Sequence, residues 1–318
     1  MSARIDLSGR SAIVTGAGRG LGRAYAVALA AAGAGVVVND MDEAAAQETV
    51  ALVTDAGGRA TAVVAAVGDA EVAETLVDTA VKEFGRLDVL VTNAGVLRDG
   101  VLWKMSDEAF DLVTRTHLRG TFTCARAAAV RFREQGEGGR IILVGSPAGQ
   151  HGNFGQTNYA AAKAGIAAMA RTWALELARA EVTVNAIVPT AWTQMTASIP
   201  IYAPLVDAVE AGEPLPRQVR QAHAIGTPED SASLVVFLAA DAAAGITGQA
   251  IGIGGDKLSL YSHPAEVAAA FHDGGWTPEL IAENWSTTME PMTQRYGITL
   301  PELDLPEPSH PEPAQTAS

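Results

Sequence analysis

A tyrosine and a lysine lie four residues apart in the stretch "YAAAK", at Tyr159 and Lys163. Four residues make about one turn of an α-helix, so both side chains would lie on one helical face. A phenol beside an ammonium is either an ordinary surface pair or an acid–base device. A free tyrosine titrates near ~10, and an ammonium ~4 Å away at an effective dielectric of ~20 contributes about 4 kcal/mol, or about three pKa units. Lys163 could therefore make Tyr159 a base near neutral pH, as the oxidation of an alcohol requires.

A glycine-rich loop, "TGAGRGLG", follows the first predicted strand and opens the first predicted helix. Gly16, Gly20 and Gly22 would let the backbone turn tightly and approach a pyrophosphate at the helix N-terminus. Asp40, at the end of the second predicted strand, could accept hydrogen bonds from both ribose hydroxyls and would repel a 2′-phosphate. The alternative is a plain tight turn with Asp40 as a helix cap. The combination favours a dinucleotide site and NAD over NADP, with Arg19 near a phosphate.

Short β-branched runs alternate with Ala- and Leu-rich segments of helical spacing. Nearly continuous apolar runs indicate a parallel sheet that is covered on both faces. We therefore expect a Rossmann-type α/β fold, a doubly wound parallel sheet of about seven strands with helices on both faces. The expected strands are 11–16, 34–40, 61–67, 87–95, 139–146, 182–189 and 248–255, and the expected helices are 21–32, 43–56, 70–84, 107–117, 119–135, 159–180 and 229–241.

The alternation is interrupted once and then ends. Residues 187–227 contain five prolines and no clean period, which is typical of a functional loop, here a candidate substrate loop within an NAD-binding domain spanning 1–260. Residues 261–300 are expected to form a helical C-terminal extension, with helices over 263–275 and 277–289. The Pro- and Glu-rich tail, 301–318, is predicted to be disordered.

Composition excludes several classes of function. Acidic residues outnumber basic ones, 36 to 22, which argues against nucleic-acid binding. The single cysteine suits a reducing compartment, and neither a signal core nor a membrane-spanning run is found, so we expect a cytoplasmic protein with no membrane association. The isolated histidines show no spacing for a metal site.

The glycine loop, "NAG" at 93–95, Ser146 and "YAAAK" together resemble the classical short-chain dehydrogenase/reductase family over about residues 8–255. Within it, "VVVND", "NAGVLRD", "HLRGTF" and "GNFGQTNYAAAKAGI" are similar to one branch. That branch is the (R)-3-hydroxyacyl-CoA dehydrogenase part of the peroxisomal multifunctional β-oxidation enzyme, with bacterial relatives that act on acyl-CoA or steroid substrates. Its members also carry a C-terminal extension.

The resemblance implies roles for individual residues. Tyr159 resembles the general acid/base, Lys163 the residue that binds the nicotinamide ribose and lowers the pKa of the tyrosine, and Ser146 the hydroxyl that orients the substrate oxygen. His117 stands where the family usually has an asparagine that holds a water for proton exchange. The implied cofactor-binding residues are Gly16, Arg19, Gly20, Leu21, Gly22, Asp40, Val67, Asn93, Ala94, Gly95, Tyr159, Lys163, Pro189 and Thr190.

The sequence therefore predicts an NAD-dependent oxidoreductase that interconverts a secondary alcohol and a ketone on a 3-hydroxyacyl-CoA or a hydroxysteroid. Substrate contacts are expected from the loop that follows the sixth strand, at Trp192, Met195, Thr196, Ile199 and Tyr202. The alternatives are a dehydrogenase of another small alcohol or terpenoid, and a non-catalytic NAD-binding sensor, which would not need an intact tyrosine–lysine pair. A stripe of small residues along 160–178 and the family's assembly predict a homodimer or homotetramer.

Overall fold

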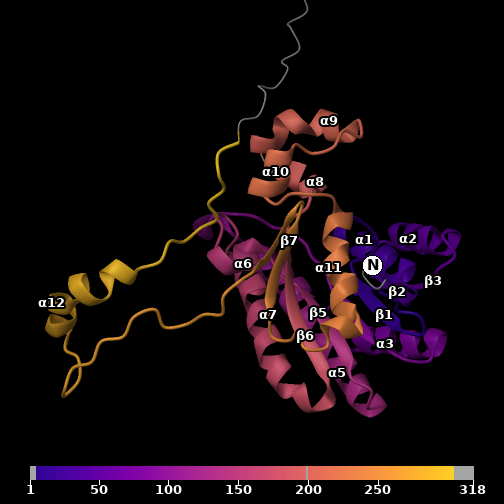
Figure 1. Cartoon of the computed structure of the whole chain (residues 1–318), viewed down its shortest axis with the longest axis horizontal. Helices are drawn as coiled ribbons and strands as arrows, with labels where there is room; N and C mark the ends of the chain where they lie inside the picture. Colours follow the sequence, from indigo (N-terminus) through magenta and orange to yellow (C-terminus); the bar gives the residue numbers. More distant parts are fainter. Residues whose placement is uncertain (1–4, 198–199, 304–318) are drawn as a thin grey trace, which may run out of the picture.

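An eight-stranded sheet forms the centre of the molecule in the computed structural model, which describes residues 5–197 and 200–303 (Figure 1). The strand order is β3-β2-β1-β4-β5-β6-β7-β8, in which the first seven strands are parallel and β8 pairs antiparallel to β7. The order reverses between β1 and β4, and this switch point is where open α/β sheets bind ligands. The strands are β1 (Ser11–Thr15), β2 (Gly35–Asp40), β3 (Arg59–Val64), β4 (Val89–Thr92), β5 (Gly139–Val144), β6 (Val182–Pro189), β7 (Ala250–Gly254) and β8 (Lys257–Leu260).

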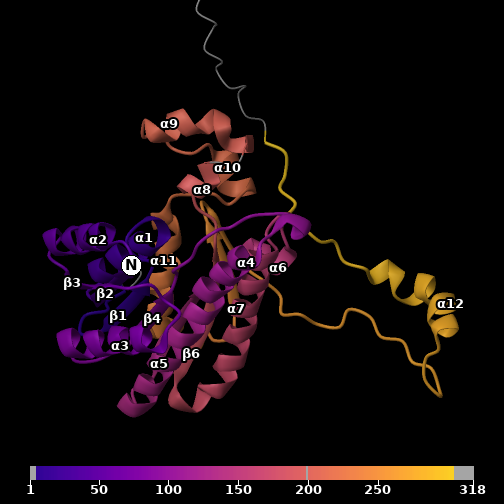
Figure 2. The ribbon, with the colours of Figure 1, turned by 180° about the vertical axis from the view of Figure 1, so that it is seen from behind.

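Helices cover both faces of the sheet, as the apolar strands predict. One apolar core joins the sheet to α1 (Gly20–Ala31), α2 (Glu43–Asp55) and α11 (Pro228–Ala239). The other joins it to α3 (Ala70–Phe84), α5 (Gly120–Gln135) and α7 (Thr157–Glu176), which face the viewer in Figure 2. Strands buried on both faces can be apolar throughout, so the prediction of a doubly wound sheet is confirmed.

The helices near the carboxyl ends of the strands are interrupted or short. Helix α4 (Asp107–Thr114) continues through a π-helical turn, Arg115–Arg119, into α5. The short helix α6 (Pro147–His151) follows β5 and packs against the start of α7. Such π-helical turns are rare and are frequently found at functional sites.

The substrate loop forms a small helical cap above the carboxyl ends of the strands (Figure 1, top). It contains α8 (Gln194–Ala197), a 3₁₀ turn (Pro200–Leu205), α9 (Val206–Glu210) and α10 (Arg217–Ala222). We use "the cap" for residues 191–197 and 200–225. The cap has an apolar cluster of its own, made of Tyr202, Leu205, Leu215, Val219 and Ile225.

Two features after β7 differ from the prediction. Lys257–Leu260 form an eighth strand, which closes a tight antiparallel hairpin with β7. Residues 263–275 contain no helix, so that prediction is wrong, whereas α12 occupies Pro278–Thr288. The 263–275 stretch has alanines of high helix propensity but packs no apolar face, and its Phe271 is 93% exposed; short helices without packing are marginal in water.

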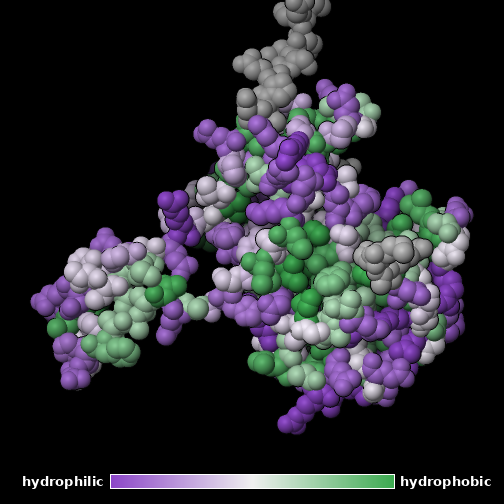
Figure 3. Space-filling model, viewed as in Figure 1, coloured by the Kyte–Doolittle hydropathy of each residue, from purple (hydrophilic) through white to green (hydrophobic). Residues whose placement is uncertain are grey.

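The C-terminal extension stands away from the sheet and then returns to it. Helix α12 lies well outside the body in both ribbon views, and apolar side chains lie at its surface (Figure 3). Trp285 is 49% exposed there. The chain returns at Gly297, whose N–H donates to the carbonyl of His151 at 2.7 Å. The predicted disordered tail lies, from residue 304, outside the described residues.

Candidate active site

Ser146 lies directly beyond β5, at the N-cap of α6. Its Oγ accepts a hydrogen bond from the N–H of Ala148 at 3.2 Å, and the residue is 9% exposed. Serine is a preferred N-cap because its oxygen satisfies one of the free N–H groups of the first turn. This N-cap hydrogen bond therefore fixes the Ser146 hydroxyl at the carboxyl end of β5.

Tyr159 and Lys163 lie one above the other on α7, as their spacing predicts. The Nζ of Lys163 is 5.6 Å from the centre of the Tyr159 ring. Lys163 is 3% exposed, and its Nζ donates to the carbonyl of Val144 at 2.6 Å, two residues before Ser146. Burial lowers the pKa of Lys163 to about 7, because a low-dielectric surrounding disfavours the charged ammonium.

In the protein without a cofactor the pKa of Tyr159 lies above its ordinary value, not below it as the sequence leads us to expect. Burial raises the pKa of Tyr159, the hydrogen bond with Ser146 offsets part of that rise, and the charge of Asp99 adds to it. The neutral phenol is thus the stable form, ready to donate a proton. Ionisation of the phenol would need further positive charge, which an oxidised nicotinamide carries when it is bound.

His117 sits in the π-helical turn with its ring edge-on to Tyr159, at 5.1 Å between ring centres. Its Nε2 lies 3.1 Å from the N–H and 2.9 Å from the carbonyl of Val96, so one of these is its partner in either tautomer. Its Nδ1 is buried without a partner, and burial followed by repulsion from Lys163 lowers the pKa of His117 to about 3. His117 is therefore a neutral imidazole beside the catalytic pair.

Gly95 makes room for this histidine. A Cβ at position 95 would lie 2.2 Å from Cε1 of His117, closer than any real side chain could approach. The sequence assigns Gly95 to the cofactor, and the structure adds this packing role. Two arginines hold the π-helical turn against the loop after β3. Arg115 donates a hydrogen bond to the carboxylate of Asp69 at 2.7 Å, and Arg119 donates one to the carbonyl of Gly68 at 2.8 Å.

The glycine loop leaves the N-terminus of α1 open. The N-cap residue Arg19 makes no capping hydrogen bond with its side chain, so the first N–H groups of the helix are free to bind an anion. A Cβ at Gly16 would lie 2.6 Å from the Cα of Ala94, and one at Gly22 would lie 2.1 Å from the carbonyl oxygen of Gly16. The loop is thus held close to the end of β4, and these residues fit the pyrophosphate of a dinucleotide.

Asp40 lies against this loop at the end of β2. Its two carboxylate oxygens accept hydrogen bonds from the N–H of Gly18 at 2.9 Å and of Asp42 at 3.1 Å. The fixed carboxylate fits a ribose diol. Arg19, expected near a phosphate, instead forms an ion pair with Asp42.

Asn93 joins the end of β4 to the glycine loop. Its side-chain amide donates to the carbonyls of Thr15 at 3.1 Å and Gly16 at 2.9 Å, while the backbone N–H groups of Asn93 and Ala94 donate to the Thr15 hydroxyl. Asn93 therefore positions the loop itself.

The other expected cofactor residues lie near the same edge of the sheet. Val67 follows β3, and a Cβ at Gly120 would lie 2.7 Å from it, so it packs on the start of α5. Pro189 ends β6, and the N–H of Thr190 donates to the carbonyl of Ile253 at 2.9 Å. Leu21 packs against the core beneath α1.

Two positioning residues were not identified from the sequence. Asn158 is fully buried, and its amide donates to the carbonyls of Arg98 at 3.0 Å and Ala109 at 3.2 Å, which fixes the first turn of α7 just before Tyr159. A Cβ at Gly149 would lie 2.5 Å from the carbonyl carbon of Lys163, so α6 can touch α7 only because residue 149 is glycine. Neither position carries a sequence signal of its own, because both depend on contacts between separate helices.

The expected substrate residues divide into two groups. Trp192 and Thr196 are half-buried at the start of the cap. The ring of Trp192 meets the ring of Tyr202 edge-on, with 6.0 Å between the ring centres. Tyr202 is 1% exposed and belongs to the core of the cap. Met195 lies on α8, and Ile199 falls outside the described residues.

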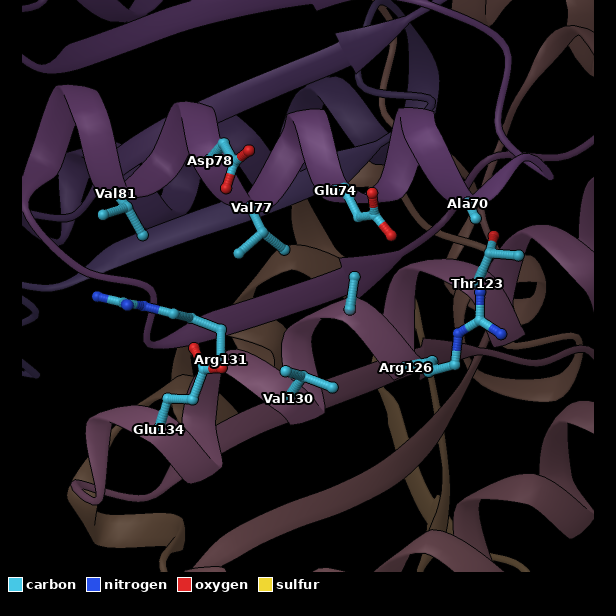
Figure 4. A pocket seen from close by; sticks show the side chains of 11 residues that line it. Ala70, Glu74, Val77, Asp78, Val81, Thr123, Arg126, Val130, Arg131 and Glu134 are labelled. Atoms are coloured by element: carbon cyan, nitrogen blue, oxygen red, sulfur yellow. The ribbon is translucent and has the colours of Figure 1, made fainter.

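A separate cavity lies between α3 and α5, away from the catalytic residues (Figure 4). Its volume is about 290 Å³, and its walls alternate acidic, basic and apolar side chains, including Glu74, Asp78, Val77, Arg126 and Arg131. It does not include any of the residues expected to bind cofactor or substrate.

A family model described as enoyl-(acyl carrier protein) reductase matches residues 16–255, which is most of the chain. The protein belongs to the short-chain dehydrogenase/reductase family. The structural neighbours agree: a short-chain dehydrogenase from Mycobacterium avium has a TM-score of 0.77 and 38% identity, covering 93% of this chain and 100% of that one. As a member of this family, the protein is an oxidoreductase that uses a nicotinamide cofactor.

Two relatives illustrate the range of the match. Hydroxyacyl-CoA dehydrogenase ChsB1 of Mycobacterium tuberculosis is 42% identical over 291 residues, covering 87% of this chain and 88% of the relative. Peroxisomal multifunctional enzyme type 2 of Drosophila melanogaster is 46% identical over 205 residues, covering 62% of this chain but only 34% of that longer protein.

Of the helices that the structure describes, none is both long enough and apolar enough to cross a membrane.

Proposed function

We propose that this short-chain dehydrogenase/reductase oxidises the secondary alcohol of a 3-hydroxyacyl-CoA to the 3-ketone, with NAD as the hydride acceptor. The arrangement of Ser146, Tyr159 and Lys163 at the end of β5 carries the proposal. The likeness to a hydroxyacyl-CoA dehydrogenase over 88% of that relative supports the acyl-CoA substrate. The open glycine loop and the fixed carboxylate of Asp40 support NAD.

The protein's own residues handle the proton. In the oxidation, the ionised phenol oxygen of Tyr159 takes the proton of the substrate hydroxyl while the carbon that bears this hydroxyl gives up its hydride, so that a carbonyl and a neutral phenol form. The Ser146 hydroxyl donates a hydrogen bond to the substrate oxygen and keeps it in line with the tyrosine. Lys163, anchored on Val144, stabilises the ionised phenol. In the reverse direction the neutral phenol, whose pKa burial raises, returns the proton to the ketone oxygen.

The preference for NAD rests on charge. Asp40 and Asp42 place two carboxylates beside the glycine loop, and the nearby guanidinium groups of Arg19 and Arg23 are paired with Asp42 and Glu48. A 2′-phosphate would meet uncompensated negative charge there. Replacement of Asp40 by serine would therefore weaken NAD binding and improve NADP binding, as measured by fluorescence titration of both reduced cofactors.

A substrate panel with a catalytic variant tests the function. We expect NADH formation with 3-hydroxyacyl-CoA and little with a hydroxysteroid, and a 10²- to 10⁴-fold fall in kcat for Tyr159→Phe with NADH affinity unchanged. Tyr25→Phe is the matched control, because the hydroxyl of Tyr25 is buried without a partner away from the site. If only the hydroxysteroid were turned over, the substrate would be a steroid and not an acyl-CoA. Full activity of Tyr159→Phe would contradict the role of Tyr159 in proton transfer.

We also propose that the protein is a homodimer or homotetramer in the cytoplasm. One face of α7 is exposed and consists of small residues, at Ala161, Ala164, Ala168 and Thr172. The neighbouring α5 exposes Phe122 and Val130, which are 41% and 52% accessible. Small residues allow two helices to approach closely, and the apolar side chains beside them would gain from burial in a partner.

A further inference from the structure

The returning C-terminal segment crosses from α6 to the cap. We call residues 297–303 "the strap". At one end, the N–H of Gly297 donates to the carbonyl of His151, the last residue of α6, at 2.7 Å. At the other, the carbonyl of Pro301 lies 2.7 Å from Nε2 of His223, which follows α10 in the cap. Both ribbon views show this segment passing α6 toward the cap.

His223 connects the strap to the core of the cap. The carbonyl of Pro301 can only accept, so Nε2 carries the proton and donates to it. In the neutral ring Nδ1 is then an acceptor, and the hydroxyl of Tyr202 donates to it at 2.7 Å. Burial raises the pKa of Tyr202 to about 12, which keeps its hydroxyl protonated as this relay requires. His223 and Tyr202 are 3% and 1% exposed, so the relay is shielded from water.

Packing and backbone conformation support the same connection. Leu303 of the strap packs against the apolar cluster of the cap that contains Tyr202 and Val219. Ala224, the residue after His223, has a left-handed backbone with φ of 56°. Non-glycine residues adopt this conformation only where their surroundings enforce it, and here the neighbouring histidine is hydrogen-bonded on both nitrogens.

The two anchors lie on segments that follow neighbouring strands at the carboxyl edge of the sheet. Helix α6, with Ser146 as its N-cap, follows β5, and the cap begins just beyond Thr190, after β6. Three residues lie between Gly297 and Pro301, and the four Cα–Cα steps that join them can span about 14 Å at most. The strap therefore bridges two segments that both issue from the catalytic end of the sheet, and it places Ile298 and Leu300, 36% and 45% exposed, between them.

We propose that the strap is the outer wall of the substrate entrance, and that His223 is the positioning residue that holds it there. The apolar side chains of the strap would then contact the distal part of a long acyl chain, which a short acyl chain does not reach. This assignment of chain-length preference rests on the proposed function. The attachment of the strap does not.

Hydrogen exchange followed by mass spectrometry tests the attachment. In His223→Leu we expect at least tenfold faster exchange of amides in the strap and in residues 201–223. His223→Gln should restore protection, because its amide can donate to Pro301 and its carbonyl can accept from Tyr202. The control is His272→Leu, a histidine on the exposed part of the extension whose Nδ1 contacts only the nearby carbonyl of Gly275. Unchanged exchange in His223→Leu would overturn the proposal.

Kinetics with a C4 and a C16 3-hydroxyacyl-CoA test the preference. His223→Leu should raise KM for the C16 thioester about tenfold and change kcat and the KM for the C4 thioester less than twofold, with His223→Gln close to the wild type. Equal effects on both thioesters would overturn the specificity role. If the wild-type enzyme turned over neither thioester, the proposed function would fail, while exchange would still decide whether the strap is attached. Should His223→Leu not fold, Tyr202→Phe removes one bond of the relay and is expected to show smaller effects in the same direction.

Discussion

Lys163 is a buried amine, and its burial lowers the stability of the folded protein while placing it where it can act on Tyr159. Its ammonium is held 2.6 Å from the Val144 carbonyl in a site that excludes water, close enough to Tyr159 to act on it. Burying a charge with one neutral partner is unfavourable for folding, and enzymes accept such costs at functional sites. The same geometry that stabilises a tyrosinate therefore destabilises the folded protein.

This cost predicts an unusual pH dependence. Between pH 7, the approximate pKa of Lys163, and its ordinary value of 10.5, the unfolded chain holds a proton that the folded protein lacks, so the free energy of unfolding rises with pH across this window. Below pH 7 the full penalty applies, about 5 kcal/mol at about 1.4 kcal/mol per pKa unit. Lys163→Met should thus stabilise the cofactor-free protein by several kcal/mol at pH 6 and change its stability little at pH 10.

Urea denaturation of both proteins at pH 6, 8 and 10 measures this difference. Titration of groups that do not interact with Lys163 cancels in the comparison, whereas the pKa of His117 rises once the repulsion from Lys163 is removed. The lost hydrogen bond to Val144 contributes about 1 kcal/mol of destabilisation that does not depend on pH. A stability difference that stays constant from pH 6 to pH 10 would contradict the prediction.

For single residues of the site, some features could be predicted from the sequence and others could not. Tyr159, Lys163 and the glycine loop could be predicted because helical spacing and loop position determine their arrangement. The raised pKa of Tyr159 could not, because it depends on how deeply the phenol is buried and on Asp99, sixty residues away. The edge-on contact of His117 likewise depends on a π-helical turn that apolar periodicity does not reveal.

At the scale of helices and strands, the contacts between helices determine the geometry of the site more than the formation of each helix does. The sequence predicts the strands and the main helices because their apolar periods are long and regular. It places a helix over 263–275 where the structure has none, since propensity alone does not stabilise a segment that packs against nothing. It also shows no sign of the close contact between α6 and α7, which holds Ser146 beside the helix of Tyr159 and Lys163.

That contact makes Gly149 a sensitive position. In Gly149→Ala the new methyl group would start 2.5 Å from the backbone of Lys163, so α6 must move outward by about 1 Å and carry its N-cap Ser146 with it. A displacement of this size at a substrate-orienting group costs about 10²-fold in kcat. We expect that loss with NADH affinity unchanged, measured by steady-state kinetics and fluorescence titration.

Gly245→Ala is the control for this substitution, because a Cβ at position 245 meets nothing within 4 Å. Both variants should keep the circular dichroism spectrum of the wild type. Equal activities of the two alanine variants would show that α6 does not need glycine to position Ser146.

At the scale of the whole molecule, the surface bears on the proposed association with like chains. The chain has a net charge of −14, and apolar and small side chains remain exposed on α5, α7 and α12. A stable dimer buries about 1,600 Å² in total, which a pair of long helices from each chain can supply. The exposed face of α7 lies on the side of the helix opposite Lys163, so association there would brace the catalytic helix without covering the site.

This arrangement predicts that one large charged residue on α7 will separate the subunits. Ala164→Arg places a guanidinium in the middle of the exposed small-residue face, where close approach of a partner helix would bury it without a counter-ion. Light scattering after size exclusion should then give the mass of one chain, 32.8 kDa, in place of a multiple of it. Ala51→Arg adds the same charge to an exposed position of α2, on the opposite face of the sheet, and should leave the assembly intact. A multimeric mass for Ala164→Arg would place the subunit contact elsewhere than on α7, and a single-chain mass for the wild type would overturn the proposed assembly.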